Sequence, residues 1–464
     1  MRRLLVPALF VSLVILSVGT PLTTSAVSAA VPAAPTFNKD ILPILQKNCQ
    51  GCHRPGAIAP MSFLTFKDTR PYAKAIAKAV VGRTMPPWFA DPTIGHFENA
   101  KVLSEDEIAT IAAWAEKGAV EGHAKDKPAP VIFNDGWTIG KPDIVVTMPK
   151  DIEIPATGVI DQSNVLVYAR FEKDMWVKAA EVRPGNPRAV HHMKAWIRPP
   201  NSNWMKDAPE GALYSPPRGA IGTDGPPQVA ALSATGYRPA QDILAKYNPG
   251  VEGQEFATGN AAKFIAAGSD IVFEVHYTAT GKPETDRSSV GIVLADGPPQ
   301  QRHLTTTAIS ARDFEIPAGA PNHEVRGETI VNEAAKLVWI QPHMHYRARN
   351  YELTIVYPTG KEETILRVPN YRFDWQVGYE LAEPIDLPKG TKFKTVAHYD
   401  NSRANKFNPD PTKNVRYGAQ SWDEMHVTFV GVLIDAKTNP ARTFGSGRPP
   451  ARPAPSGVEG PAAQ

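Results

Sequence analysis

Proline and glycine interrupt this chain so often that a bundle of long helices has no room to form. The 464 residues include 45 prolines and 34 glycines, and both residue types disfavour the interior of a helix. A chain of this length is expected to form two or three domains of roughly 100–200 residues each. With 42% hydrophobic and 21% charged positions, we expect packed β-rich domains and exclude a mini-protein or a generally disordered chain.

The first thirty residues have the pattern of an export signal. Arg2 and Arg3 precede an apolar run over residues 4–18, and small residues follow up to Ala30. A membrane anchor is the alternative, but the run is shorter than the ~20 apolar residues of a spanning helix, and no later stretch qualifies. We predict that residues 1–30 are a cleaved signal peptide and that the protein is exported, to the periplasm or the outside, without stable membrane insertion.

Charge and cysteine content exclude two further classes. The formal net charge is only +3, which gives no electrostatic reason to bind nucleic acid. Cys49 and Cys52 are the only cysteines, so a framework of several disulfides is excluded.

The sequence pattern changes along the chain, from a part with helix signals to a β-rich part. Residues 36–124 show helical signals: the capping box Ser104-Glu105-Asp106-Glu107 starts a helix that Gly118 ends, and a second helix is expected over residues 70–81. Short β-rich runs separated by proline and glycine then predict two β-sandwiches, over residues 140–296 and 297–438, with a hairpin whose strands are residues 351–357 and 362–368. Residues 439–464 have the composition of a disordered tail.

The sequence Cys49-Gln50-Gly51-Cys52-His53 has the spacing of covalent c-type haem attachment. The two thiols, one helical turn apart, would bond the haem, and the histidine would bind its iron. A redox dithiol or a structural disulfide is the alternative, but export, the adjoining histidine and the lack of other cysteines disfavour both. Residues 36–124 therefore resemble a small c-type cytochrome domain with one covalent haem.

The sixth ligand of the haem iron is open among three residues. Met85 follows the second expected helix, where the chain can return to the distal side, and a thioether would raise the reduction potential as an electron carrier requires. Met61 is its competitor and His96 comes third, although a methionine here is by default a packing residue. We favour Met85.

Three histidine motifs lie in the β-rich part. The first is Val190-His191-His192-Met193, the second is Glu274-Val275-His276-Tyr277, and the third is His343-Met344-His345. A His-x-His pair on a strand directs both rings to the same face, which suits copper or zinc. A single surface histidine usually has no ligand role, but three such motifs in one β-rich region predict metal binding.

Together with Asp423-Glu424-Met425, these motifs resemble, in their order, the copper type II, ascorbate-dependent monooxygenases. This family includes peptidylglycine alpha-hydroxylating monooxygenase and dopamine beta-monooxygenase. The resemblance covers about residues 140–436 and implies two tandem β-sandwiches with one copper each. It implies that His191, His192 and His276 bind the electron-transfer copper. It further implies that His343, His345 and Met425 bind the copper that activates dioxygen and are the catalytic residues.

Two positions differ from the peptide-hydroxylating relative. Its arginine two residues before the His-x-His pair is Gln341 here, and its tyrosine four residues after the methionine is Phe429. Its glycine-extended peptide substrate is therefore not carried over. His426, next to Met425, would face the opposite side of its strand and is not a ligand. For His398, hydrogen bonding in a loop is favoured over a place in the substrate cleft.

The sequence thus predicts a fold class of a small all-α cytochrome c domain followed by two tandem all-β sandwiches. The predicted function is an exported copper monooxygenase that hydroxylates a small organic substrate with dioxygen. Electrons would come from ascorbate or a redox protein through the haem. The first alternative is a non-catalytic haem and copper protein that relays electrons to a partner, and the second is a copper-handling or substrate-binding module.

Overall fold

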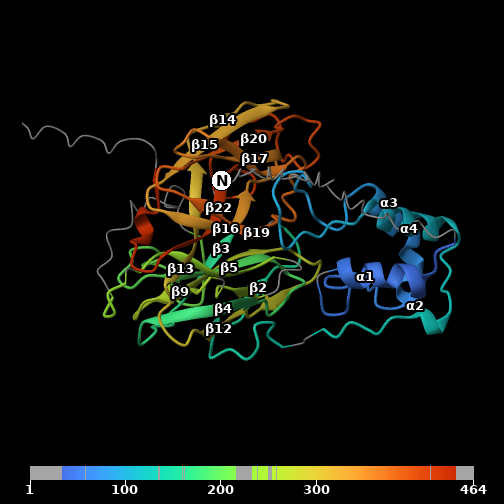
Figure 1. Ribbon diagram of the computed structural model, residues 1–464, viewed down its shortest axis with the longest axis horizontal. Helices are drawn as coiled ribbons and strands as arrows, with labels where there is room; N and C mark the ends of the chain where they lie inside the picture. Colours follow the sequence, from blue (N-terminus) through green and yellow to red (C-terminus); the bar gives the residue numbers. More distant parts are fainter. Residues whose placement is uncertain are drawn as a thin grey trace, which may run out of the picture.

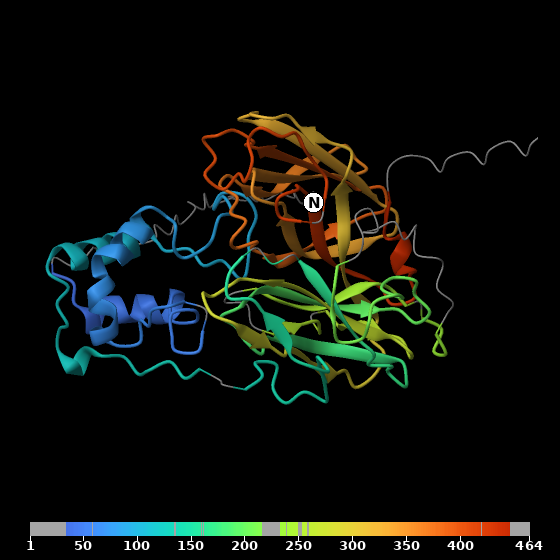
Figure 2. The same cartoon turned by 180° about the vertical axis from the view of Figure 1, so that it is seen from behind.

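The computed structural model describes residues 34–445, except for residues 58, 134–135, 159, 161, 216–232, 238, 249–252, 258 and 419. Two β-rich halves are stacked on one another, and a helical segment extends from one side of them (Figures 1 and 2). Strands account for 37% of the described residues and helical residues for 12%. The predicted signal peptide, residues 1–30, lies outside the described residues. Among the described residues, no helix is long and apolar enough to cross a membrane.

The helical segment contains four short α-helices. They are α1 (Leu42–Asn48), α2 (Phe66–Thr69), α3 (Ala73–Val81) and α4 (Glu105–Glu116), with short turns η1 (Phe37–Ile41), η2 (Arg70–Tyr72) and η3 (Ala124–Asp126). The predicted capping box is confirmed, because Ser104 accepts from the Glu107 backbone N–H while the Glu107 carboxylate accepts from that of Ser104. The predicted helix over residues 70–81 is also confirmed, as η2 followed by α3. Phe37, Ile41 and Trp114 lie in the buried cluster between these helices.

The first β-rich half consists of two facing sheets. Its strands are β1 (Ile144–Thr147), β2 (Ile152–Ile154), β3 (Ser163–Val167), β4 (Met175–Arg183), β5 (Val190–Arg198), β6 (Leu213–Tyr214), β7 (Asp242–Tyr247), β8 (Gln254–Glu255), β9 (Ala261–Ile265), β10 (Asp270–Tyr277), β11 (Glu284–Asp286) and β12 (Ser289–Leu294). Strands β6-β3-β10-β5-β7 form one sheet, and β1-β12-β4-β9 form part of the other. Val165, Val177 and Ile271 lie in the apolar core of this half, with alternate residues of each strand turned inward.

The second half repeats this arrangement. Its strands are β13 (Gln301–Ala311), β14 (Glu315–Ile316), β15 (His323–Val331), β16 (Ala335–His343), β17 (Ala348–Val356), β18 (Glu362–Val368), β19 (Tyr379–Leu387), β20 (Lys392–Tyr399), β21 (Val415–Arg416), β22 (His426–Asp435) and β23 (Phe444–Gly445). The predicted hairpin is confirmed as β17 and β18. Leu337, Leu353 and Phe393 lie in its core.

The two halves are joined through one continuous sheet. Strands β1-β12-β4-β9-β13-β22-β16-β19, with β8 beside β4, form a nine-stranded sheet, in which β9 and β13 pair in parallel over two residue pairs. Asp242 of β7 reinforces this junction, because its Oδ1 accepts from Lys263 Nζ at 2.8 Å and from the Thr305 backbone N–H at 2.8 Å. A second apolar cluster, here called the interface cluster, lies between the halves. Its buried members include Trp196, Ile243 and Val272 from the first half and Trp339, Val427 and Phe429 from the second.

The predicted fold class, with a small all-α cytochrome domain and two tandem sandwiches, is wrong. Strand far outweighs helix in the part of the chain that the structure describes, and the longest helix there has 12 residues. Residues 88–99 of the helical segment leave the helices and pack on the second half: Phe97 forms a bridge with Leu381, and Trp88 lies 5.0 Å from the Tyr379 ring centroid. The helices therefore do not close into a separate domain, and the shared sheet makes one body of the two β-rich halves.

The start of the predicted disordered tail is folded. Turn η4 (Pro440–Arg442) and strand β23 follow β22, and β23 pairs with β15. Residues 446–464 lie outside the described residues.

Candidate metal centre

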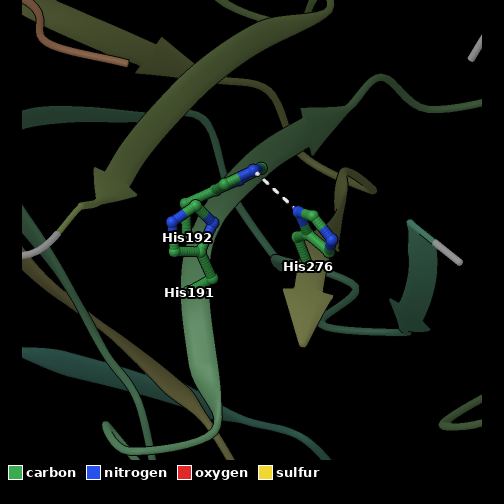
Figure 3. Close-up of side chains that lie close together, drawn as sticks. All are labelled: His191, His192 and His276. Atoms are coloured by element: carbon green, nitrogen blue, oxygen red, sulfur yellow. Dashed lines mark hydrogen bonds between the residues drawn. The ribbon is translucent and has the colours of Figure 1, made fainter. Parts of the chain in front are cut away.

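Three histidines from two neighbouring strands converge at one end of the first half (Figure 3). His192 on β5 stands opposite His276 on β10, but the next pair in register is Val190 with Tyr277, so His191 is an extra residue in a β-bulge. Consecutive residues of a regular strand point to opposite faces, and a bulge re-aims the extra side chain. The bulge therefore explains how the adjacent His191 and His192 reach one site, which we call the three-histidine centre.

The ligand atoms of the three-histidine centre are close enough to share one ion. One ring nitrogen of each histidine lies within 4.8 Å of the others, and His276 Nδ1 is 3.4 Å from His192 Nε2. That separation matches two ligands of one tetrahedral ion, since metal–imidazole bonds measure about 2.0–2.1 Å. The donor set of three imidazoles fits copper or zinc.

Burial keeps these imidazoles unprotonated. It lowers the pKa of His276 to about 4, and neighbouring His191 adds to the effect. The pKa of His192 is held well below its ordinary value by burial and then by His276, and burial also lowers the pKa of His191. At neutral pH all three rings therefore have a lone pair available to a metal.

The His-x-His pair lies at the end of β16 in the second half. The His343 and His345 ring centroids are 5.3 Å apart with the ring planes perpendicular, and both side chains are buried. His343 Nδ1 is 2.7 Å from Gln376 Oε1, and His345 Nδ1 is 3.3 Å from the Asp423 carbonyl oxygen. Each contact leaves Nε2 free toward a metal. Burial lowers the pKa of His343 to about 3 and that of His345 well below its ordinary value.

A buried carboxylate links the backbone of Met425 to that of His345 through hydrogen bonds. Glu424 is fully buried, and its oxygens accept hydrogen bonds from the backbone N–H groups of His345, Arg347 (3.1 Å) and Met425 (2.9 Å). Met425 directly precedes β22 and packs half-buried in the interface cluster. We call His343, His345 and Met425 the His-His-Met centre. Burial raises the pKa of Glu424 to about 7, although the hydrogen bonds from the three N–H groups lower it.

One phenylalanine lies between the two centres. The Phe373 ring centroid is 6.5 Å from that of His191, 6.3 Å from that of His276 and 6.0 Å from that of His345. Phe373 and Gln376 were not predicted from the sequence, and Glu424 was singled out only as part of the motif that ends at Met425. An aromatic-rich run over residues 371–375, after the expected strand 362–368, was the one available signal for this segment.

The other singled-out side chains have structural partners. Gln341 donates to the Gln376 carbonyl oxygen at 2.5 Å, and the Phe429 ring lies 5.9 Å from that of His343. His426 is buried and bonds to Thr395 Oγ1 at 2.7 Å, away from the centres. His398 lies on strand β20, where its Nδ1 is 3.0 Å from Asn350 Oδ1.

The haem motif follows α1 in the helical segment. Cys49 and Cys52 are free thiols, and burial raises the pKa of Cys49 to about 12. The His53 ring stacks on Phe63 at 4.2 Å, and its buried Nδ1 has no hydrogen-bond partner. Covalent haem attachment requires two free thiols to bond the haem and an imidazole nitrogen to bind its iron, and these three groups are present here.

The three proposed sixth ligands lie in different surroundings. Met61 packs against the helical cluster together with Cys49, and its backbone accepts a hydrogen bond from the His53 ring. Met85 is half-buried in the loop after α3. The carbonyl oxygen of His96 accepts from the Ala382 backbone N–H at 3.0 Å, which places His96 on the second half.

Comparisons with known proteins identify no family. No protein-family model and no curated protein matches the chain. A structure of infectious bursal disease virus, Gx strain, is 7% identical over 68% of this chain and 80% of that one, with a TM-score of 0.18. The N-terminal CBM22-1–CBM22-2 tandem domain of Paenibacillus barcinonensis Xyn10C is 11% identical over 64% of this chain and 94% of that one, with a TM-score of 0.13. Similarity at this level supports no conclusion about fold or function.

Proposed function

We propose that this chain is an exported copper-dependent monooxygenase that receives electrons through a covalently attached haem. The observation that carries the proposal is the pairing of two unlike histidine centres across one phenylalanine ring. One centre offers three nitrogen donors, and the other offers two nitrogens, with the backbone of Met425 held next to His345 through Glu424. Thioether sulfur favours copper(I), so the donor sets suit copper better than zinc.

The reaction would insert one atom of dioxygen into a C–H bond of an organic substrate. The other oxygen atom leaves as water, which requires two electrons and two protons beyond those of the broken bond. The electrons would come from ascorbate or a redox protein, one at a time through the haem. When bound, each copper would supply one-electron chemistry, which the protein keeps available by holding five unprotonated imidazoles.

The protein's own residues would orient the ligands and admit the substrate. Gln376 and the Asp423 carbonyl oxygen fix the His343 and His345 rings, and Glu424 holds the Met425 backbone against His345. A shallow surface hollow beside this centre is lined by Tyr346, Phe373 and Phe407, among others.

Copper titration of the full chain is the first test. We expect two copper ions per haem-loaded chain, and one after His276→Ala. The matched control, His398→Ala, removes a histidine outside both centres and should leave two. One copper or none in the unmodified chain would contradict the proposal.

Oxygen uptake then separates an oxygenase from an electron relay. With ascorbate as donor and a panel of small organic compounds with weak C–H bonds, we expect oxygen consumption matched by hydroxylated product. Met425→Ala should abolish product formation while the haem is still reduced. If the copper-loaded chain reduces and reoxidises its haem but hydroxylates nothing in the panel, the relay function replaces the oxygenase.

A further inference from the structure

A single loop segment contacts both histidine centres. Residues 371–376 belong to the connection between β18 and β19, far in sequence from β5 and β10. The Asp374 carbonyl oxygen is 2.8 Å from His191 Nε2 of the three-histidine centre. Two residues later, Gln376 Oε1 is 2.7 Å from His343 Nδ1 of the His-His-Met centre. The ring of Phe373 lies 6.5 Å from that of His191 and 6.0 Å from that of His345, so the same segment also places a side chain beside both centres.

Residues from both halves hold this segment in place. Asn248 from the first half donates to the carbonyl oxygens of Trp375 at 3.3 Å and Gln376 at 3.1 Å. Gln341 from the second half donates to the same Gln376 carbonyl at 2.5 Å, and the Tyr371 hydroxyl donates to the Met344 carbonyl at 3.0 Å. The segment is therefore fixed relative to both centres.

The conformation of Gln376 is unusual for a residue with packing as its only role. Its φ is +41°, in the left-handed region, and its side chain is buried with the amide Nε2 unpartnered. Strained backbone and an incompletely paired buried amide both cost stability, and such features concentrate at functional sites. The hydrogen bond that the Gln376 side chain does make, through Oε1, is the one to His343 Nδ1.

We propose that residues 371–376 are a positioning segment shared by the two centres, with Gln376 as the positioning residue of His343. This inference rests on the proposed function, because it assigns the segment a role toward the same metal ligands. The side-chain amide oxygen of Gln376 accepts from His343 Nδ1, which fixes the proton on that nitrogen and leaves Nε2 to the metal. The Asp374 backbone carbonyl does the same for His191 through Nε2, which leaves Nδ1. Partners of this kind orient metal ligands and raise their affinity.

The test uses the full chain and two substitutions of Gln376. Gln376→Met keeps the volume and removes the hydrogen bond, and Gln376→Glu keeps an acceptor for His343 Nδ1. Arg372→Gln is the matched control, because the Arg372 side chain in the same segment points to the exposed Asp374 carboxylate. The first readout is the imidazole tautomer of His343 in the metal-free, ¹⁵N-histidine-labelled chain. The second is copper affinity at each centre.

We expect the Nδ1–H tautomer of His343 in the unmodified chain, in Gln376→Glu and in the control, and its loss in Gln376→Met. We also expect Gln376→Met to weaken one of the two coppers by about 10–100-fold and to leave the other unchanged. An unmodified chain that takes up no copper would refute the proposed function, while the tautomer would still test the positioning of His343. Two coppers bound equally well by Gln376→Met, with the tautomer unchanged, would overturn the positioning role.

Discussion

Removing the Glu424 carboxylate is the sharpest test of how the His-His-Met centre is held. This fully buried side chain accepts from the backbone N–H groups of His345, Arg347 and Met425. The residues come from two segments that are about 80 positions apart in the chain. Glu424→Ala would leave three N–H groups without an acceptor, two of them buried and that of Met425 partly buried, and would remove the link between Met425 and His345.

The expected loss of stability follows from these hydrogen bonds. Each buried N–H left unpaired costs about 1–3 kcal/mol. Burying the carboxylate itself is unfavourable, as the raised pKa of Glu424 shows, and this offsets part of the loss. We therefore expect Glu424→Ala to cost about 3–5 kcal/mol, the range for removing one partner of a buried charged group. Glu424→Gln should cost about 1–3 kcal/mol, because it keeps Oε1 but turns a donor toward the Arg347 N–H.

Scanning calorimetry of the metal-free full chain measures the effect. A change of 1 kcal/mol shifts Tm by about 2–4 °C in a unit of 150–250 residues, and the shift is smaller in a larger unit. Because the two halves form one body, we use the lower figure and expect Glu424→Ala to lower Tm by roughly 6–10 °C. The control Glu383→Ala removes an exposed carboxylate on β19 and should change stability by about 0.5 kcal/mol at most. A Glu424→Ala transition within about 2 °C of this control would show that the carboxylate does not hold the centre together.

Three further predictions concern the rest of the molecule. Asp242→Ala should destabilise the junction of the halves by about 3–5 kcal/mol in urea unfolding, because buried Lys263 loses its charged partner and the Thr305 N–H loses its acceptor. A loss below about 1 kcal/mol would contradict this. Burial, then Lys263, holds the pKa of His303 well below 6.5, so the unfolded chain binds the extra proton and stability falls as pH drops below 6.5. His303→Phe should reduce this fall between pH 7 and 5, and an identical pH profile would refute it. Copper should raise Tm of the metal-free chain and a chelator should reverse it; an unchanged Tm would argue against a folded metal site.

Local features were predictable from the sequence because neighbouring residues determine them. The capping box around Ser104 and the left-handed glycine at Gly118 (φ +92°) fix the ends of α4 through contacts within a few residues. The hairpin of β17 and β18 likewise depends on strand patterns on either side of one turn. The histidine motifs were recognisable as candidate ligands, although strand alternation alone would direct His191 and His192 to opposite faces, and the bulge that unites them has no sequence signal.

The predicted fold class is wrong where contacts between residues far apart in the sequence determine the structure. The parallel pairing of β9 with β13 covers two residue pairs and leaves no periodic pattern, so the sequence suggested two separate sandwiches. Trp88 and Phe97 looked like part of a helical domain, but they pack against Tyr379 in the second half. The contact of His191 with the Asp374 carbonyl spans 183 positions and uses a backbone atom. No residue type identifies such a partner.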